Sequence, residues 1–216
     1  GEAGQVGVHV GEGRDERVDH AIAEGIRQDR RVRRRAHRGA DDPAGVARTV
    51  ELLVDVGAAG VSIEDYHLGT GGIEPVDVAA ERISAAAQLC DRHGMVLTAR
   101  AENHLYGVDD LADTITRLQA YRAAGAGAVY APGLADRDQI GRLVTEVGGP
   151  VNVLALPGGP TVSQLAELGV RRVSTGGALA WAAYGAMAEA AQELTGPGTS
   201  GYQVRGLSAD LRAALD

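Results

Sequence analysis

The sequence contains no lysine and no phenylalanine, one cysteine, and no long apolar run. All 21 of its basic residues are arginine, which excludes a Schiff-base lysine and a Walker-type phosphate loop, because both need an amine. The single cysteine, Cys90, excludes an internal disulfide framework and fits a reducing cytoplasm. No stretch has the ~18 consecutive apolar residues of a membrane span, and the first residues lack the basic-then-apolar order of a secretory signal. We therefore expect a cytoplasmic protein with no membrane partner.

The charge distribution is uneven along the chain. The formal net charge is −8, which argues against a general nucleic-acid binder. Arginine nevertheless fills seven of the twelve positions from Arg27 to Arg38. This run has no interleaved aromatic residues that could stack on bases. We expect no nucleic-acid partner, and an RNA- or DNA-binding arm is the alternative for this run.

From Asp42 onward the chain repeats a strand–helix pattern. Asp42-Pro43 is typical of a helix start, and Asp109 or Asp110 can start a later helix. Short apolar runs alternate with helix-like stretches, which indicates parallel β/α architecture. The length allows one barrel or doubly wound domain, or two small domains. No G-x-G-x-x-G motif follows a first strand, which weakens a dinucleotide-binding interpretation. We predict neighbouring parallel strands, buried on both faces and in this order, at 60–64, 95–99, 127–131, 151–155 and 171–175.

Polar residues follow these strands, where parallel β/α folds carry their chemistry. A carboxylate here can hold a divalent metal, and an arginine can bind a carboxylate or phosphate through two hydrogen bonds. The alternative is an ion pair between Glu64 and Arg100 that only closes the rim. The residues concerned are Glu64 and Asp65, Arg100 and Glu102, Tyr130, and Ser174 to Gly176.

Glycines mark the last strand–helix junction, "STGGALA". Backbone N–H groups at Gly176 and Gly177 can receive an anion, as helix N-termini do, or the glycines can serve a tight left-handed turn. The stretch 66–72, "YHLGTGG", is too loose for a phosphate loop and is interpreted as a mobile lid.

Four further side chains near these segments allow a functional or a structural interpretation. His67 and His104 can act as general acid or base, or can simply be solvated. Cys90 and Trp181 lie in helix-like stretches and are expected to be packing residues.

With these residues placed, the sequence resembles the isocitrate lyase/phosphoenolpyruvate mutase superfamily, and in particular its less characterised bacterial members. The motifs that carry the resemblance cover about residues 41–196 in family order. They are "DDPAGVARTVELLVDVGA", "GAAGVSIED", "LTARAEN", "GAGAVYAPGL" and "NVLALPGGPTVSQLAELGVRRVSTGGALAWAAYGA".

The resemblance implies a (β/α)8 TIM barrel that assembles as a dimer or tetramer. It implies Mg²⁺ chemistry on a small 2-oxo or 2-hydroxy carboxylate or a phosphonate, with C–C or P–C bonds made or broken through an enolate-like intermediate. Glu64 matches the family's metal carboxylate, and Arg100 matches its substrate-carboxylate arginine. We expect substrate contacts from Asp65, Glu102, Gly176 and Gly177.

The chain departs from the family pattern at several points. It lacks the Lys-Cys-Gly-His-type loop of the lyases, carries Pro132 where they carry an acid, and has Trp181 where an arginine is usual. A tricarboxylate substrate therefore fits poorly. Counting back from Pro43 places Arg34 and Ala36 where two metal-binding acids belong, and the first two strands are not recognisable in 1–40.

These departures give three segments: an atypical, Arg-rich 1–40, a barrel domain over 41–196, and a tail over 197–216. We interpret 1–40 as a frameshifted or otherwise non-native segment, with a genuine, divergent arm as the alternative. The main hypothesis is a Mg²⁺-dependent lyase or mutase-like enzyme. The alternative is a catalytically inactive member that acts as a binding or oligomer partner. Because the third-strand acids are missing, we predict weak or absent Mg²⁺ binding and little turnover. Asp41 and Asp42 are the candidate replacement ligands.

Overall fold

A five-stranded parallel sheet forms the centre of the protein. The computed structural model describes residues 42–67, 69–206, 208 and 213, so the predictions for 1–40 lie outside the described residues. The strand order is β1-β4-β5-β6-β7, and every neighbouring pair is parallel. This confirms the predicted strands and their order. The bounds are β1 Gly60–Glu64, β4 Val96–Arg100, β5 Ala128–Tyr130, β6 Val151–Leu154 and β7 Arg172–Ser174.

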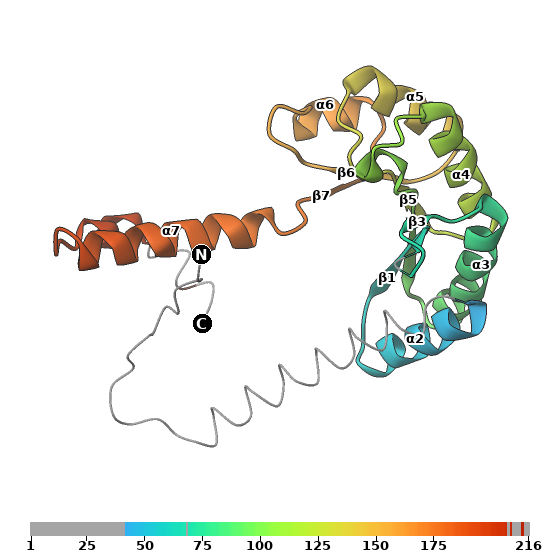
Figure 1. Ribbon diagram of the computed structural model, residues 1–216, viewed down its shortest axis with the longest axis horizontal. Helices are drawn as coiled ribbons and strands as arrows, with labels where there is room; N and C mark the ends of the chain where they lie inside the picture. The colour runs from blue at the N-terminus through green and yellow to red at the C-terminus, as the bar shows by residue number, and fades with distance from the viewer. Residues whose placement is uncertain (1–41, 68, 207, 209–212, 214–216) are drawn as a thin grey trace.

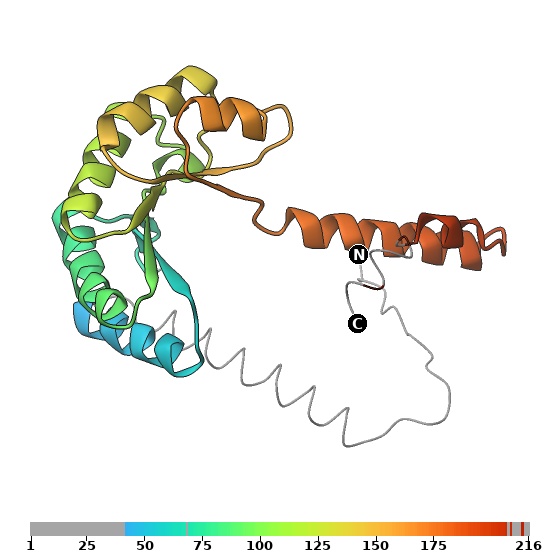
Figure 2. The same ribbon diagram turned by 180° about the vertical axis from the view of Figure 1, so that it is seen from behind.

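Helices follow the outer side of this curved sheet. Figures 1 and 2 show the strands on the inner side of an arc and the helices α2 to α5 along its outer side. Helix α2 precedes β1, and each of the helices α3 to α6 joins two parallel strands, as a β/α repeat requires. The fold is therefore of α/β type with the barrel-like β/α pattern that the sequence predicts. The helices are α2 Pro43–Asp55, α3 Val76–Arg92, α4 Leu111–Ala123, α5 Arg137–Val147 and α6 Val162–Glu167.

Side-chain caps fix where α2, α4, α5 and α6 begin. The Asp42 carboxylate accepts a hydrogen bond of 2.6 Å from the Gly45 N–H, which confirms the predicted start of α2. Asp110, rather than Asp109, caps α4, and Asp136 caps α5. Thr161 and Gln164 form a capping box at α6. Local sequence thus determines these four helix starts before any tertiary packing is considered, whereas α3 begins after Pro75 without a side-chain cap.

The hydrophobic core lies between the sheet and the outer helices. Fully buried apolar side chains come from both layers, including Val50, Ile83, Leu118 and Val129. Cys90 belongs to this core, as predicted. The expected burial of both strand faces is wrong for the inner face of β1 and β4, where Val96 is 55% exposed. The reason is that β1 and β7 each have only one neighbour among the described strands, so the arc is open on its inner side.

Two short elements sit at the carboxyl ends of the strands. The strands β2 Tyr66–His67 and β3 Gly72–Ile73 form an antiparallel hairpin directly after β1. The 3-10 helix η1, Asn103–Tyr106, follows β4. Both segments therefore border the edge of the sheet at which the polar residues were predicted.

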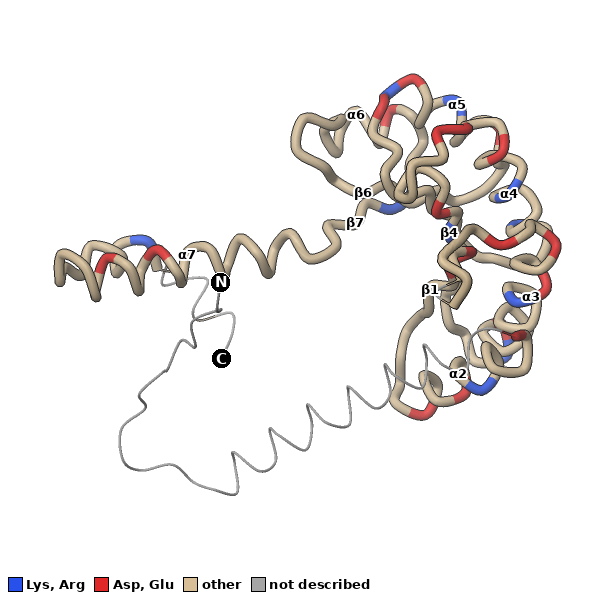
Figure 3. Tube along the Cα trace, in the orientation of Figure 1, with Lys and Arg blue, Asp and Glu red and all other residues tan. Residues whose placement is uncertain are grey.

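The last long helix, α7 Ala178–Thr195, extends away from the sheet (Figure 1) and is followed by the 3-10 helix η2, Gly201–Arg205. None of the residues of α7 is buried, and its first half carries no charged residue (Figure 3). The packing role predicted for Trp181 is therefore wrong within the described residues. Its side chain is 74% exposed and contacts Tyr184 edge-on at 6.1 Å between ring centroids. Among the described residues, no helix is long and apolar enough to cross a membrane.

Candidate functional site

A row of polar side chains crosses the inner face of the sheet. The strand register places one residue of each strand in this row: Glu64, Arg100, Tyr130, Asn152 and Arg172. Residues at the same register position of neighbouring strands point to the same face. The row therefore brings together an acid, a base, a phenol, an amide and a second base at adjacent positions.

Arg100 is the most strongly held member of this row. Its Nε donates to Glu102 Oε1 at 2.7 Å, and its terminal nitrogen lies 3.5 Å from Glu64 Oε2. The guanidinium also lies over the Tyr130 ring, 5.3 Å from its centroid. Glu64 and Arg100 thus lie together at the carboxyl ends of β1 and β4, and the alternative ion pair between them is present. We call the edge of the sheet that these two residues border the mouth.

The two carboxylates that flank Arg100 differ in environment. The Glu102 side chain is 2% exposed, whereas that of Glu64 is 39% exposed. Burial raises the pKa of Glu102 above its ordinary value, and the hydrogen bond and charge of Arg100 only partly oppose this. Burial acts to lower the pKa of Arg100, but its bond to Glu102 and the charges of both carboxylates outweigh burial and raise it. Glu102 is therefore the fixed partner of Arg100, and Glu64 is the exchangeable one.

Asp65 lies directly after Glu64 but is fully buried, with 0% of its surface exposed. Its Oδ1 accepts from the Glu102 backbone N–H at 2.9 Å. Its Oδ2 accepts from the Tyr121 hydroxyl at 2.6 Å and from Arg117 at 3.3 Å. The structure thus surrounds this carboxylate with protein donors, beneath the mouth that Glu64 and Arg100 border.

Helix α4 supplies the groups that hold Asp65. Arg117 donates at 2.7 Å to the Glu74 carbonyl and at 2.6 Å to Asp113. The amide of Asn103 also donates to Asp113, at 2.7 Å. Burial and the adjacent Asp65 charge raise the pKa of Tyr121, so its hydroxyl stays protonated and donates. These contacts connect α4 to the segment after the β2–β3 hairpin, through Glu74, and to η1, through Asn103.

The two candidate histidines occupy different surroundings. The His104 side chain is 6% exposed, and its ring nitrogens lie 3.2 Å from Asp109 Oδ1 and 3.2 Å from Thr114 Oγ1. It is neither solvated nor open to the mouth. His67 lies in the β2–β3 hairpin and accepts a hydrogen bond from the Thr70 N–H at 3.0 Å. Acid–base roles for both stay predictions.

The stretch predicted to be a lid contains the β2–β3 hairpin, with residue 68 outside the description. Tyr66 stacks on Tyr106 of η1, with ring centroids 3.7 Å apart and planes inclined by 5°. This contact fastens the hairpin to the segment that follows β4. Lid motion stays a prediction.

Gly176 and Gly177 form the turn between β7 and α7. Gly176 has φ +53°, in the left-handed region that favours glycine, which agrees with the structural alternative for this motif. The Ala178 N–H donates to the Thr175 carbonyl at 3.0 Å within this turn. Anion binding by this segment stays a prediction.

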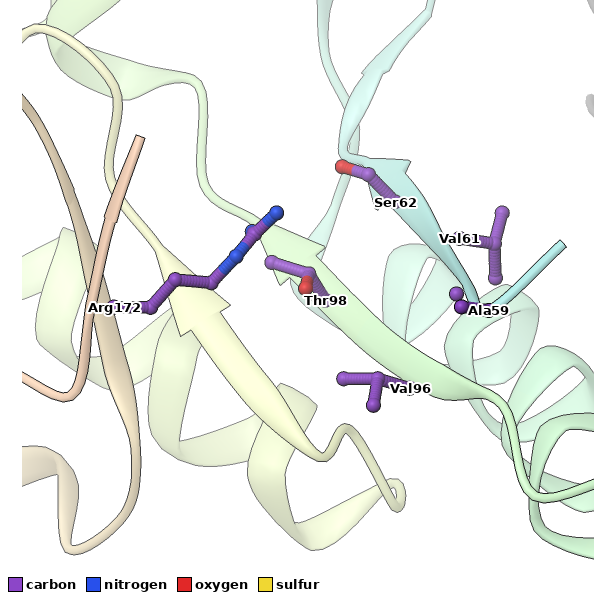
Figure 4. A pocket seen from close by; sticks show the side chains of 7 residues that line it. Ala59, Val61, Ser62, Val96, Thr98 and Arg172 are labelled. Carbon is purple, nitrogen blue, oxygen red and sulfur yellow. The ribbon is translucent and has the colours of Figure 1, made fainter. Parts of the chain in front are cut away.

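Sequence reasoning missed Asn152 and Arg172. Arg172 lines a hollow of about 470 Å³ on the inner sheet face together with Ser62 and Thr98, and its side chain extends toward Thr98 (Figure 4). Asn152 donates to Ser174 at 3.0 Å, while its buried Oδ1 has no partner among the described residues. Arg172 lies two residues before Ser174 in β7, and Asn152 pairs with Tyr130 in the strand register. Because alternate residues of a strand point to the same face, the polar residues Ser174 and Tyr130 are the signal that could have revealed them.

The described residues do not form a conventional magnesium site. No group of three or more His, Cys, Asp or Glu side chains there is arranged to hold a metal ion. Glu64 is the exposed carboxylate of the mouth, and its oxygen is already paired with Arg100. Of the two candidate replacement ligands, Asp42 caps α2 and Asp41 lies outside the described residues. A bound Mg²⁺ usually needs one or two carboxylates that are free to coordinate it.

Comparison with known proteins gives consistent matches. The family model described as phosphoenolpyruvate phosphomutase matches residues 16–195. An oxaloacetate decarboxylase of Bradyrhizobium sp. is 34% identical over 189 residues, covering 83% of this chain and 64% of that protein. A candidate lyase/mutase structure from Burkholderia cenocepacia J2315 has 44% identity and a TM-score of 0.73, covering 81% of this chain and 64% of that one.

A solved oxaloacetate acetylhydrolase, in complex with the product oxalate, has 28% identity and a TM-score of 0.66. The match covers 76% of this chain and 59% of that structure. The chain spans between 34% and 64% of the length of the curated relatives that it matches. The family match begins at residue 16, so it includes part of the segment that the sequence analysis set apart.

Proposed function

The chain belongs to the phosphoenolpyruvate phosphomutase family, and on this basis we propose that it is a lyase or mutase-like enzyme that acts on a small 2-oxo or 2-hydroxy carboxylate. The reaction makes or breaks a C–C or P–C bond next to the oxo group through an enolate-like intermediate. A small phosphonate is the related substrate class. The observation that carries this proposal is the Glu64–Arg100–Glu102 arrangement at the carboxyl ends of β1 and β4.

In this proposal Arg100 binds the substrate carboxylate. Its Nε is held by the buried Glu102, which leaves the terminal nitrogens as the side that can change partner. The Glu64 contact is longer, at 3.5 Å, and exposed, so it stabilises the site little. A substrate carboxylate can replace Glu64 on the terminal nitrogens with charge-assisted hydrogen bonds. This exchange frees the Glu64 carboxylate beside the reacting carbon.

The relatives support the substrate class. They include an oxaloacetate decarboxylase and an oxaloacetate acetylhydrolase, so oxaloacetate is the first compound to test. A mouth with one substrate-binding arginine suits a dicarboxylate or smaller acid better than a tricarboxylate, because each further carboxylate needs its own cation. Gly176 and Gly177 complete the proposed set of residues around this substrate, while the buried Glu102 holds Arg100 and the buried Asp65 holds Glu102.

The family chemistry favours Mg²⁺ as the electron sink, which also suits a chain without lysine. We propose Glu64 as a metal carboxylate and expect weak or absent Mg²⁺ binding by this chain, with little turnover. The described side chains alone do not provide the usual ligand set for this metal.

Three further proposals concern the surroundings of the enzyme. The protein acts in the cytoplasm, without nucleic-acid or membrane partners. It forms a homo-oligomer, a dimer or tetramer, which is supported by the exposed apolar side chains of α7: Leu179, Trp181, Tyr184 and Met187. The alternative function is an inactive family member that acts as a binding or oligomer partner, and the pairing of the Glu64 carboxylate with Arg100 favours it.

The substitution Arg100→Ala tests the proposed carboxylate contact. Oxalate is titrated calorimetrically in the presence of MgCl₂, and oxaloacetate turnover is followed by NMR of its products. Loss of a charge-assisted contact costs about 1.5–3 kcal/mol, which weakens oxalate binding about 10- to 100-fold. Arg142→Ala is the matched control, because Arg142 lies on the exposed face of α5 and pairs only with Glu146. Equal oxalate affinity of wild type and Arg100→Ala would contradict the assignment.

A further inference from the structure

Residues 100–102 carry the side chains of Arg100 and Glu102 at the end of β4. Hydrogen bonds to the chain on both sides, at the ends of β1 and β5, fix the backbone of this segment. The Arg100 carbonyl accepts from the Asp65 N–H at 3.2 Å, and the Ala101 N–H donates to the Tyr130 carbonyl at 3.0 Å. The Glu102 N–H then donates to the Asp65 side chain at 2.9 Å. Residues 100–102 are therefore held toward β1 twice and toward β5 once.

The hydrogen bond from the Glu102 N–H to the Asp65 side chain takes the place of a backbone hydrogen bond that continued parallel pairing of β1 and β4 would provide. Beyond Glu64 the chain leaves the sheet for the β2–β3 hairpin, and the Asp65 carbonyl accepts from the Glu74 N–H at 2.7 Å. No backbone carbonyl of β1 then remains opposite the Glu102 N–H, because β1 ends at Glu64. The Asp65 side chain supplies the acceptor instead, as short acidic side chains do where regular structure ends.

Donors from α4 fix the direction of the Asp65 carboxylate. Tyr121 and Arg117 both bind Oδ2, which leaves Oδ1 for Glu102. A planar carboxylate with both oxygens held has a single orientation. The position of the Glu102 backbone, and with it the buried side chain that holds Arg100 Nε, therefore depends on Asp65.

We propose that Asp65 is a positioning residue of this mouth: its carboxylate fixes the Glu102 N–H and thereby directs the Arg100 guanidinium toward the substrate. Asp65 thus acts through Glu102 and Arg100, in place of the direct substrate contact expected from its sequence position. The proposal rests on the proposed function only where it takes Arg100 to bind the substrate carboxylate.

Two variants separate this role from a purely electrostatic one. Asp65→Asn keeps an oxygen for the Glu102 N–H, and its amide can donate to the Tyr121 oxygen, but it loses the charge that faces Arg117. Asp65→Ala loses the same charge and also the acceptor for Glu102. A role limited to neutralising Arg117 predicts the same result for both variants, whereas positioning predicts that Asp65→Asn retains wild-type geometry.

The primary measurement is the NMR signal of the Arg100 Nε–H, identified by its loss in Arg100→Gln. In wild type and in Asp65→Asn this proton exchanges slowly, because it is bonded to buried Glu102. In Asp65→Ala its exchange accelerates about tenfold or more. Leu118→Ala is the matched control: Leu118 is a fully buried residue of α4, so its truncation destabilises the core and leaves the signal unchanged. Unchanged exchange in Asp65→Ala, or equal acceleration in both Asp65 variants, overturns the proposal.

A second measurement covers the case in which Asp65→Ala does not fold. The Glu102 backbone amide of the wild-type protein should exchange with deuterium at least about 100-fold more slowly than an unbonded amide, since it donates to a buried carboxylate. Unprotected exchange overturns the proposal. Oxalate affinity adds a functional readout, with about tenfold weaker binding in Asp65→Ala and near wild-type binding in Asp65→Asn. If wild type binds no oxalate, the proposed function fails, and the exchange measurements still decide the role of Asp65.

Discussion

The buried ion pair between Glu74 and Arg82 should be among the most expensive contacts to break in this protein. Glu74 follows the β2–β3 hairpin and Arg82 lies on α3, and their side chains are 6% and 7% exposed. Arg82 also donates to the Glu64 carbonyl at 3.3 Å, at the end of β1. We consider the substitution Arg82→Met, which preserves much of the side-chain volume and removes the charge.

The expected cost follows from burial. Removing one partner of a buried pair leaves an uncompensated charge and typically costs about 3–5 kcal/mol of unfolding free energy. For a domain of this size, about 1 kcal/mol lowers the Tm by ~2–4 °C, so a fall of roughly 6–20 °C is expected. The double variant Glu74→Leu/Arg82→Met removes both charges and should recover most of this loss, because an apolar pair of similar volume carries no desolvation penalty.

Urea and thermal denaturation measure these differences directly. Arg142→Met is the matched control, because Arg142 forms an ion pair with Glu146 while its side chain is 53% exposed. Breaking such an exposed pair should cost less than about 1 kcal/mol. If Arg82→Met destabilises the protein no more than Arg142→Met, the reasoning from burial is refuted.

Two further predictions concern protons and metal. Burial, followed by the Asp65 charge, raises the pKa of Tyr121 far above its ordinary value of about 10. The contribution of Tyr121 to the free energy of unfolding is therefore complete below about pH 10 and falls at higher pH, because the unfolded chain releases the phenol proton before the folded protein does. In Tyr121→Phe, the free energy of unfolding measured by denaturation should decline less steeply at alkaline pH. Mg²⁺ titrated calorimetrically should bind no more tightly than about millimolar. Micromolar binding that Glu64→Gln abolishes would contradict this and would make Asp41 or Asp42 the replacement ligands.

The sequence alone determined the order of the parallel strands and the starts of the helices. Strand order followed from the alternation of short apolar runs with amphipathic stretches, because a crossover helix leaves few positions for the next parallel strand. The caps at Asp42 and Thr161 depend on residues three positions away, so they could be predicted locally. The placement of Glu64 and Arg100 at one mouth followed in the same way, from their positions at the ends of neighbouring strands.

Only the tertiary structure decided what surrounds these residues. The sequence treated Asp65 and Glu102 as open to substrate, yet both are buried. Helix α4 brings Tyr121 and Arg117 against Asp65, and Asp65 in turn binds the Glu102 N–H. The contacts of α4 with Asp65 join residues more than 50 positions apart, and no local periodicity encodes them. Likewise, Trp181 was expected to pack because α7 has an apolar sequence, but burial depends on where a helix lies relative to the sheet. Strand positions are set by local pattern, whereas the partner of each polar side chain is set by which distant element packs against it.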